Sequence, residues 1–296
     1  VGSTCAQRIV EKNLADVVLI DIVTGLPQGK ALDIMESAPV EGFEAKIIGT
    51  NDYERTKDSD VVIITAGLAR KPGMSRDDLL RKNAEIIRGV TEQIVHYSPE
   101  AILIIVTNPL DVMSYLAFKK SGFKSHKVLG MAGMLDTARY RYFVSEKLHC
   151  RPAEVEAVVL GGHGDTMVPV IGETKVDGTP VSEQLGSDIM AQLVERTRKG
   201  GAEIVSLLKT GSAYYAPSSS AVAMVQAIVH DTKAVLPCCV YMQGEYGLSD
   251  MYFGVPVVIG AHGAERIIEL DLSEAEKSAL EKSAQTVRAN IDKLTL

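Results

Sequence analysis

Short apolar runs recur through the first 130 or so residues, and longer amphipathic stretches separate them. Unbroken Val, Ile and Leu runs are typical of strands that helices cover on both faces, as in a parallel sheet. The alternation predicts an α/β fold with a doubly wound parallel sheet over residues 1–133. The predicted strands are Val17–Ile20, 45–49, 60–67, 101–106 and Val128–Gly130, and the predicted helices are 3–13, 26–38, 76–96 and 110–120.

The pattern changes beyond residue 134, where strands and helices no longer alternate regularly. A chain of 296 residues also exceeds the size at which one core grows comfortably, so two domains are expected. We expect an α+β second domain over residues 134–296. Its predicted helices are 135–150, 192–209, 219–229 and 273–294, and its predicted strands are 155–160, 168–171, 234–242 and 255–259.

The beginning of the chain carries part of a nucleotide-binding pattern. Gly2 and Asp21 have the separation expected between the last glycine of a G-x-G-x-x-G turn and the acid that binds a ribose. The strand and the two earlier glycines of that pattern are absent from this sequence. Either the molecule begins here or leading residues are missing, and a parallel sheet without a central strand would expose its edges. We therefore expect residues before Val1, which the mass of the intact protein would test.

Composition and charge argue against several kinds of partner and against a membrane span. The apolar fraction is 46%, the charged fraction is 23% and the net charge is −7, without any basic block. These values argue against nucleic acid or an anionic membrane as the main partner. No apolar run reaches the ~18 residues of a membrane span, and no signal peptide is apparent. The cysteines lack metal-ligand or C-x-x-C spacing, which favours buried thiols in a reducing, cytoplasmic compartment: Cys5, Cys150, Cys238 and Cys239.

One histidine stands among glycines directly after the predicted strand 155–160. The segment GGHGDTMVP contains His163, and histidine is the side chain whose unperturbed pKa lies nearest neutrality. In a dry pocket such a ring can give or take a proton. A lone buried histidine is more often a hydrogen-bonded structural residue, so its neighbours decide between the two interpretations.

Two charged residues upstream share one helical face. Asp136 and Arg139 are three positions apart at the start of the predicted helix 135–150. A carboxylate facing His163 would fix the histidine tautomer and stabilise the imidazolium. A guanidinium beside it could bind a carboxylate through two parallel hydrogen bonds. An isolated Asp-x-x-Arg pair is usually a surface ion pair.

Polar residues also follow the predicted strands, and ligands of doubly wound sheets bind at the carboxyl ends of strands. Asn108 follows strand 101–106, and its amide can both donate and accept a hydrogen bond. The basic segment 68–79 follows strand 60–67 and contains Arg70, Pro72-Gly73 and a predicted helix cap at Ser75. It is either a solvated loop or a lid that carries guanidinium groups over an anionic substrate.

Five of these segments together resemble the lactate/malate dehydrogenase family. They are VVLI followed by Asp21, ARKPGMSR, VTNPLD, LDTAR and GGHGDTMVP, in this order. The loop with Arg70 and the segments RTRKGGAEIV and GSAYYAP are similar to the NAD-dependent, lactate-dehydrogenase-like malate dehydrogenases of that family. The resemblance spans essentially the whole chain.

The resemblance implies a role for each matching residue. It implies a Rossmann domain that binds NAD, followed by a catalytic domain, with His163 as the proton donor and acceptor and Asp136 as its partner. Substrate contacts are implied for Arg139 at the C1 carboxylate, Arg76 at the reacting carbonyl, Arg70 at the second carboxylate, and Asn108. Cofactor contacts are implied for Gly2, Asp21, Asn83, Val106, Thr107 and Asn108, and no metal is implied.

The activity implied is the reversible NAD-dependent oxidation of (S)-malate to oxaloacetate, a step of the tricarboxylic acid cycle, in a homodimer or homotetramer. Asp21 favours NAD over NADP, because a carboxylate repels a 2′-phosphate. A lactate or other 2-hydroxy-acid dehydrogenase is the alternative within the family, and Arg70 argues against it. A NAD-dependent glycosidase would need a Cys/His metal pair, and a non-catalytic binding protein would be expected to lack His163 or Arg139.

Overall fold

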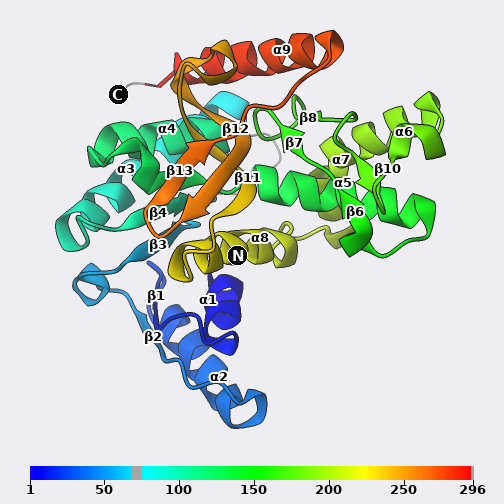
Figure 1. Cartoon of the computed structure of the whole chain (residues 1–296). Coiled ribbons are helices and arrows are strands. Elements are labelled where there is room, and N and C mark those ends of the chain that lie inside the picture. Colours follow the sequence, from blue (N-terminus) through cyan, green and yellow to red (C-terminus); the bar gives the residue numbers. More distant parts are fainter. Residues whose placement is uncertain (69–74, 295–296) are drawn as a thin grey trace.

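A six-stranded mixed sheet forms the centre of the protein in a computed structural model that describes residues 1–68 and 75–294, without the Arg76 side chain. Its order is β13-β12-β11-β5-β4-β3 (Figure 1). Neighbouring strands from β3 to β5 are parallel, and the other pairs are antiparallel. The strands are β3 (Val61–Ile64), β4 (Ile102–Ile105), β5 (Val128–Gly130), β11 (Ala234–Gln243), β12 (Ser249–Gly260) and β13 (Gly263–Ile267).

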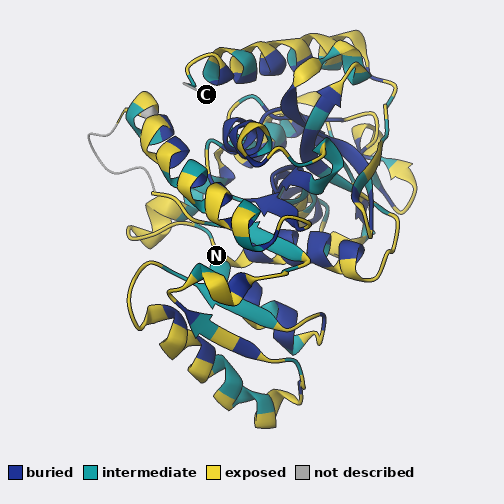
Figure 2. Ribbon diagram, turned by 90° about the vertical axis from the view of Figure 1, so that its left-hand side faces the viewer, coloured by how far each residue is buried: buried dark blue, intermediate teal, exposed yellow. Residues whose placement is uncertain are grey.

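A smaller lobe carries the first elements of the chain. The strands β1 (Val17–Ile20) and β2 (Ile47–Thr50) pair in parallel as a separate sheet, and α1 (Gly2–Glu11) and α2 (Leu26–Glu41) pack against it. Figures 1 and 2 show this lobe projecting below the rest of the molecule. No strand among the described residues joins β1 to β3. Among the described residues, β1 and β2 thus form a sheet of their own beside the main sheet.

Helices cover the main sheet, and α4 among them is buried on nearly all sides. The helices α3 (Arg76–Tyr97), α4 (Leu110–Ser121), α8 (Tyr215–Val229) and α9 (Glu274–Ile291) surround it. All four residues of β4 are buried, as the unbroken apolar run predicts. The outer face of α9 is exposed, and its inner face is buried against the body of the protein (Figure 2).

The segment after residue 133 contributes a helix pair and short antiparallel strands. The long helices are α5 (Gly133–Leu148) and α7 (Ser187–Leu208), which pack on each other. The short elements are β6 (Val155–Glu156), β7 (Val159–Leu160), β8 (Val168–Pro169), β9 (Lys175–Val176), β10 (Thr179–Pro180) and α6 (Val181–Gln184), with 3-10 turns at Tyr53–Thr56, Ser125–Lys127, Pro152–Glu154 and Glu245–Gly247.

The single strand expected over residues 155–160 was a wrong prediction. The structure has two strands there, because β6 pairs with β9 whereas β7 pairs with β8 in another sheet. Glu156, the last residue of β6, is exposed, so burial is interrupted within the run. The edge strand β13 was not predicted, and α7 begins at Ser187 instead of residue 192. None of the helices within residues 1–68 and 75–294 is long and apolar enough to cross a bilayer.

Candidate active site

His163 lies in the loop between β7 and β8. Its side chain is 16% exposed. Gly161 and Gly164 on either side of it have positive φ angles, +96° and +126°, which favour glycine. Gly162 also has no room for a side chain, because a Cβ there would lie 2.5 Å from Val287 of α9. The glycines thus let the loop turn tightly while α9 packs against it.

Asp136 and Arg139 of α5 lie beside this histidine. The Asp136 Oδ2 is 2.7 Å from His163 Nδ1, and its side chain is only 3% exposed. The other carboxylate oxygen accepts a hydrogen bond from Arg139 Nη1 at 3.3 Å. One buried carboxylate therefore joins the imidazole to the guanidinium.

Opposing effects set the pKa of His163. Burial lowers this pKa, but the charge and hydrogen bond of Asp136 raise it, the charge of Asp111 raises it further, and Arg139 lowers it. The net result is a pKa above the usual 6.5. The Nδ1 contact with Asp136 leaves Nε2 as the ring atom that can exchange a proton with a ligand.

The backbone of the histidine loop is held by two buried side chains that the sequence analysis missed. The His163 N–H donates to Asp111 Oδ2 of α4 at 2.9 Å, and the Gly162 N–H donates to Ser283 Oγ of α9 at 2.9 Å. The second Asp111 oxygen accepts from Cys239 Sγ at 3.2 Å. Burial raises the pKa of Asp111, and these donors and the His163 charge oppose that shift. Asp111 was visible in the VTNPLD segment, whereas nothing in the sequence marked Ser283.

The guanidinium of Arg139 is largely buried and only partly hydrogen-bonded. Its side chain is 13% exposed, and its buried Nε finds no hydrogen-bond partner in the described part of the chain. Burial lowers the pKa of this guanidinium, and Asp136 opposes the shift. Because a buried N–H without a partner costs free energy, a bound carboxylate would relieve it.

Side chains from neighbouring segments tie the ends of β3 and β4 together. Asn83 of α3 accepts from the Leu68 N–H at 2.8 Å and donates to the Asn108 carbonyl at 2.7 Å. Thr107 Oγ1 donates to the Ala66 carbonyl at 2.6 Å. Val106 is half-buried, and the exposed Asn108 precedes a cis peptide bond to proline. The predicted residues Asn83, Val106, Thr107 and Asn108 thus meet at the carboxyl ends of these strands.

The small lobe offers groups that fit a dinucleotide. Helix α1 begins at Gly2 without a side-chain cap and without an acidic residue in its first turn, so its first N–H groups suit a phosphate. A Cβ on Gly2 would lie 2.9 Å from Thr65 Oγ1, so a side chain at this position would force Thr65 to shift. Asp21 follows β1 and accepts from the Val23 N–H at 2.9 Å, which leaves its second oxygen for a ribose hydroxyl. The chemistry of these groups fits NAD.

Two predicted arginines cannot be placed in this geometry. Arg70 lies outside the described residues. Arg76 is the first residue of α3, but its side chain is not among the described atoms. The start of α3 is fixed by Ser75 and Asp78, which form a capping box.

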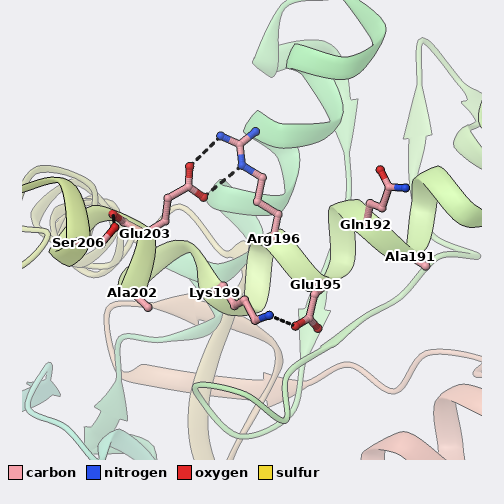
Figure 3. Close-up of a pocket in the computed structure, with 8 residues that line it drawn as sticks. All are labelled: Ala191, Gln192, Glu195, Arg196, Lys199, Ala202, Glu203 and Ser206. Atoms are coloured by element: carbon pink, nitrogen blue, oxygen red, sulfur yellow. Dashed lines mark hydrogen bonds and ion pairs between the residues drawn. The ribbon is translucent and has the colours of Figure 1, made fainter.

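A depression elsewhere on the surface is separate from the candidate active site around His163. A shallow depression of about 840 Å³ lies on the outer face of α7, where Arg196 pairs with Glu203 and Lys199 with Glu195 (Figure 3). None of the predicted site residues lines it. Within residues 1–68 and 75–294, no three His, Cys, Asp or Glu residues are grouped to hold a metal ion.

The chain is similar in sequence and fold to known malate and lactate dehydrogenases. Residues 1–130 match the NAD-binding domain of the lactate/malate dehydrogenase family, and residues 133–295 match its α/β C-terminal domain. Malate dehydrogenases of Chloroherpeton thalassium and Synechocystis are 57% and 54% identical over 99% of this chain, covering 95% and 90% of their own lengths.

Solved structures extend the comparison to both branches of the family. The malate dehydrogenase of Salinibacter ruber is 50% identical, with a TM-score of 0.95 over 99% of this chain and 94% of its own. A lactate dehydrogenase of Cryptosporidium parvum, solved with lactic acid and its nicotinamide cofactor, is 43% identical, with a TM-score of 0.95 over 98% of this chain and 93% of its own.

Proposed function

This chain belongs to the lactate/malate dehydrogenase family, and we propose that it catalyses the reversible NAD-dependent oxidation of (S)-malate to oxaloacetate. The observation that carries the proposal is the buried group of His163, Asp136 and Arg139, in which a proton-transferring ring lies beside a carboxylate-binding cation. The expected second carboxylate contact, Arg70, distinguishes malate from lactate.

The cofactor is NAD, which takes up a hydride, that is, a proton with two electrons, in malate oxidation and returns it in oxaloacetate reduction. The residues that would hold it are Gly2 at the start of α1, Asp21 after β1, and the strand-end group of Asn83, Val106, Thr107 and Asn108. Asp21 supports NAD over NADP, because its carboxylate would repel a 2′-phosphate. Equal kcat/KM values with NADH and NADPH would contradict this assignment of Asp21.

His163 moves the proton. In oxaloacetate reduction the protonated ring donates from Nε2 to the carbonyl oxygen, and in malate oxidation the neutral ring accepts the hydroxyl proton there. Asp136 holds the opposite nitrogen, which fixes the ring orientation and stabilises the positive charge in a buried place. The raised pKa of His163 increases the protonated fraction available for reduction near neutral pH.

Arginines bind and polarise the substrate in this proposal. Arg139 binds the C1 carboxylate through its unpartnered edge. Arg76 stabilises negative charge that develops on the reacting oxygen, so its loss should lower kcat more than it raises KM. Arg70 binds the second carboxylate, and an unpaired Arg70 would disfavour the methyl group of pyruvate.

Absorbance of NADH at 340 nm tests the proposal with oxaloacetate and pyruvate as competing substrates. We expect kcat/KM to favour oxaloacetate by ~10³, because its second carboxylate can form a charge-assisted hydrogen bond with Arg70, whereas the methyl group of pyruvate leaves that cation unpaired. Preference for pyruvate would support the alternative, a lactate dehydrogenase. The variant Arg70→Gln should shift the ratio toward pyruvate, and an unchanged ratio would contradict the role given to Arg70.

We further propose a cytoplasmic enzyme of the tricarboxylic acid cycle that functions as a homodimer or homotetramer, with an NAD-binding domain at residues 1–133 and a catalytic domain at residues 134–296. The four cysteines, all free in the structure, support a reducing compartment. Light scattering on the eluted protein would measure the subunit number, and a monomer would contradict self-association.

A further inference from the structure

Two adjacent glycines lie deep inside a long helix. Gly200 and Gly201 occupy the second half of α7, which runs for 22 residues. Glycine weakens a helix interior relative to alanine, because it loses more backbone freedom on folding. The pair belongs to the RTRKGGAEIV segment, and the roles proposed above do not explain it. A packing reason is therefore to be sought on the face that the glycines present.

That face lies against Arg139 of α5. A Cβ built on Gly200 would lie 3.1 Å from Arg139 Cδ and 3.5 Å from its Nε. A Cβ on Gly201 would lie 3.6 Å from Nη2 and 3.9 Å from Nη1. The Arg139 side chain thus extends along the two glycines, with its stem over Gly200 and its guanidinium over Gly201.

Contacts made by two residues just before the glycines hold α7 against α5 and the histidine loop. Arg196 on the outer face pairs with Glu146 of α5 at 2.7 Å, and its guanidinium lies 4.2 Å from the Phe143 ring centroid. Figure 3 shows Arg196 pairing also with Glu203 along the helix. Arg198 donates to the Met167 carbonyl, in the loop after His163, at 3.1 and 3.2 Å. These contacts with α5 and with the histidine loop oppose a withdrawal of α7 that would admit a side chain at position 200.

We propose that Gly200 is a positioning residue whose lack of a side chain sets where the Arg139 guanidinium meets the substrate carboxylate. This inference rests on the proposed function. A methyl group at position 200 forces Arg139 Cδ to move by a few tenths of an ångström, and the guanidinium moves with it. On its other side Arg139 is held by Asp136, so the displaced guanidinium loses its alignment with the carboxylate.

Three alanine substitutions separate this role from helix propensity. Gly89→Ala in α3 is the matched control, because a Cβ there meets no described atom within 4 Å. It should raise the melting temperature by about 2 °C and leave the kinetics unchanged. Gly200→Ala should raise KM for oxaloacetate about tenfold, with the Kd for NADH unchanged. Gly201→Ala, whose Cβ would make only ordinary van der Waals contacts with Arg139, should change this KM by less than about twofold.

A double-mutant cycle with Arg139→Ala supplies a readout that does not depend on activity. Without the long side chain the methyl at position 200 has room, so Gly200→Ala should then raise the melting temperature by the full ~2 °C. In the parent protein crowding against Arg139 should remove that gain. This difference in melting temperature between the two backgrounds measures the contact directly.

An unchanged KM for oxaloacetate in Gly200→Ala would overturn the proposal. So would an equal change in melting temperature in the two backgrounds, because the glycine would then not act through Arg139. A parent protein that fails to reduce oxaloacetate would contradict the proposed function instead. In that case the melting-temperature cycle alone decides whether Gly200 positions Arg139.

Discussion

The residue whose environment most directly controls the proposed chemistry is His163. Burial alone would lower its pKa, but the charge and hydrogen bond of Asp136, together with the charge of Asp111, raise it above the usual value. In Asp136→Asn the charge is lost and burial remains, so the pKa should fall. Oxaloacetate reduction needs the protonated ring, which exists below that pKa. We expect the alkaline limb of the kcat/KM profile to move by at least about one pH unit downward, with kcat/KM at pH 8 reduced by ~10² or more.

Asp111→Asn should shift the pH profile in the same direction as Asp136→Asn, but by less. Its carboxylate meets the His163 backbone, and the amide oxygen of asparagine can still accept that N–H. Its charge contributes less to the His163 pKa than that of Asp136, so the same limb should move in the same direction by a smaller amount. Identical pH profiles for the parent and Asp136→Asn would contradict the pairing of Asp136 with His163.

The same raised pKa has a consequence for stability. A base with a higher pKa in the folded than in the unfolded state stabilises the fold fully below the unfolded value, about 6.5 for histidine. That contribution disappears as the pH rises through the folded-state pKa of His163. Loss of the Asp136 charge should therefore destabilise the protein more below pH 6 than above the folded-state pKa.

At this scale the sequence predicted the local relations better than the distant ones. The spacing of Asp136 and Arg139 placed them on one helical face, and they do form an ion pair. The approach of Asp136 to His163 across 27 residues became an expectation only through the family resemblance. The role of Ser283 was missed, because a serine within an amphipathic helix does not indicate which distant N–H it will accept.

Among the elements, α9 supports the histidine loop from outside the candidate active site. Ser283 is fully buried, accepts from the Gly162 N–H and donates to Thr166 Oγ1 at 3.1 Å. In Ser283→Ala the Gly162 N–H loses its partner, which should lower the free energy of unfolding by about 1–3 kcal/mol. Because the adjacent residue is His163, kcat should fall while the Kd for NADH is retained. Urea unfolding and steady-state kinetics measure the two effects.

Ser278→Ala is the matched control on the same helix, since Ser278 is exposed. It should change unfolding by less than about 0.5 kcal/mol and leave kcat unchanged. If Ser283→Ala and Ser278→Ala behaved alike, the contact between α9 and the loop would carry no free energy.

The ends of individual strands and helices show which of them the local sequence pattern can predict. Strand β4 and helix α4 were predicted to within one residue at each end, because burial on all sides leaves long apolar signals. The run 155–160 misled the prediction because short strands depend on their partners, and β6 and β7 have different ones. Strand β13 contains exposed Glu265 and Arg266, so its pairing with β12 leaves little apolar signal.

For the whole molecule, the chief unpredicted feature is the continuity of the main sheet. Strand β11, expected in the second domain, pairs with β5 through Cys239 and Gly130. A Cβ on Gly130 would lie 2.9 Å from the Cys239 Cβ, so the absence of a side chain permits this approach. Strand order in such a sheet depends on contacts between distant parts of the chain, which periodicity does not encode.

The two parts of the proposed site should respond separately to their ligands. The groups assigned to NAD precede residue 110, whereas His163 and Arg139 belong to the later part. A ligand at 100 times its Kd stabilises the folded protein by about 2.7 kcal/mol. NADH should therefore raise the melting temperature by about 5 °C in both the parent and Arg139→Ala.

Malonate, a dicarboxylate that cannot be reduced, should add a further rise of about 5 °C in the parent when NADH is present at the same relative concentration. In Arg139→Ala this second increment should largely disappear, because the carboxylate loses a charge-assisted pair of hydrogen bonds. Chloride at equal ionic strength controls for a general salt effect. If malonate stabilised both proteins alike, Arg139 would not bind the carboxylate. If Arg139→Ala lost the stabilisation by NADH, the cofactor-binding and substrate-binding parts of the site would not respond separately.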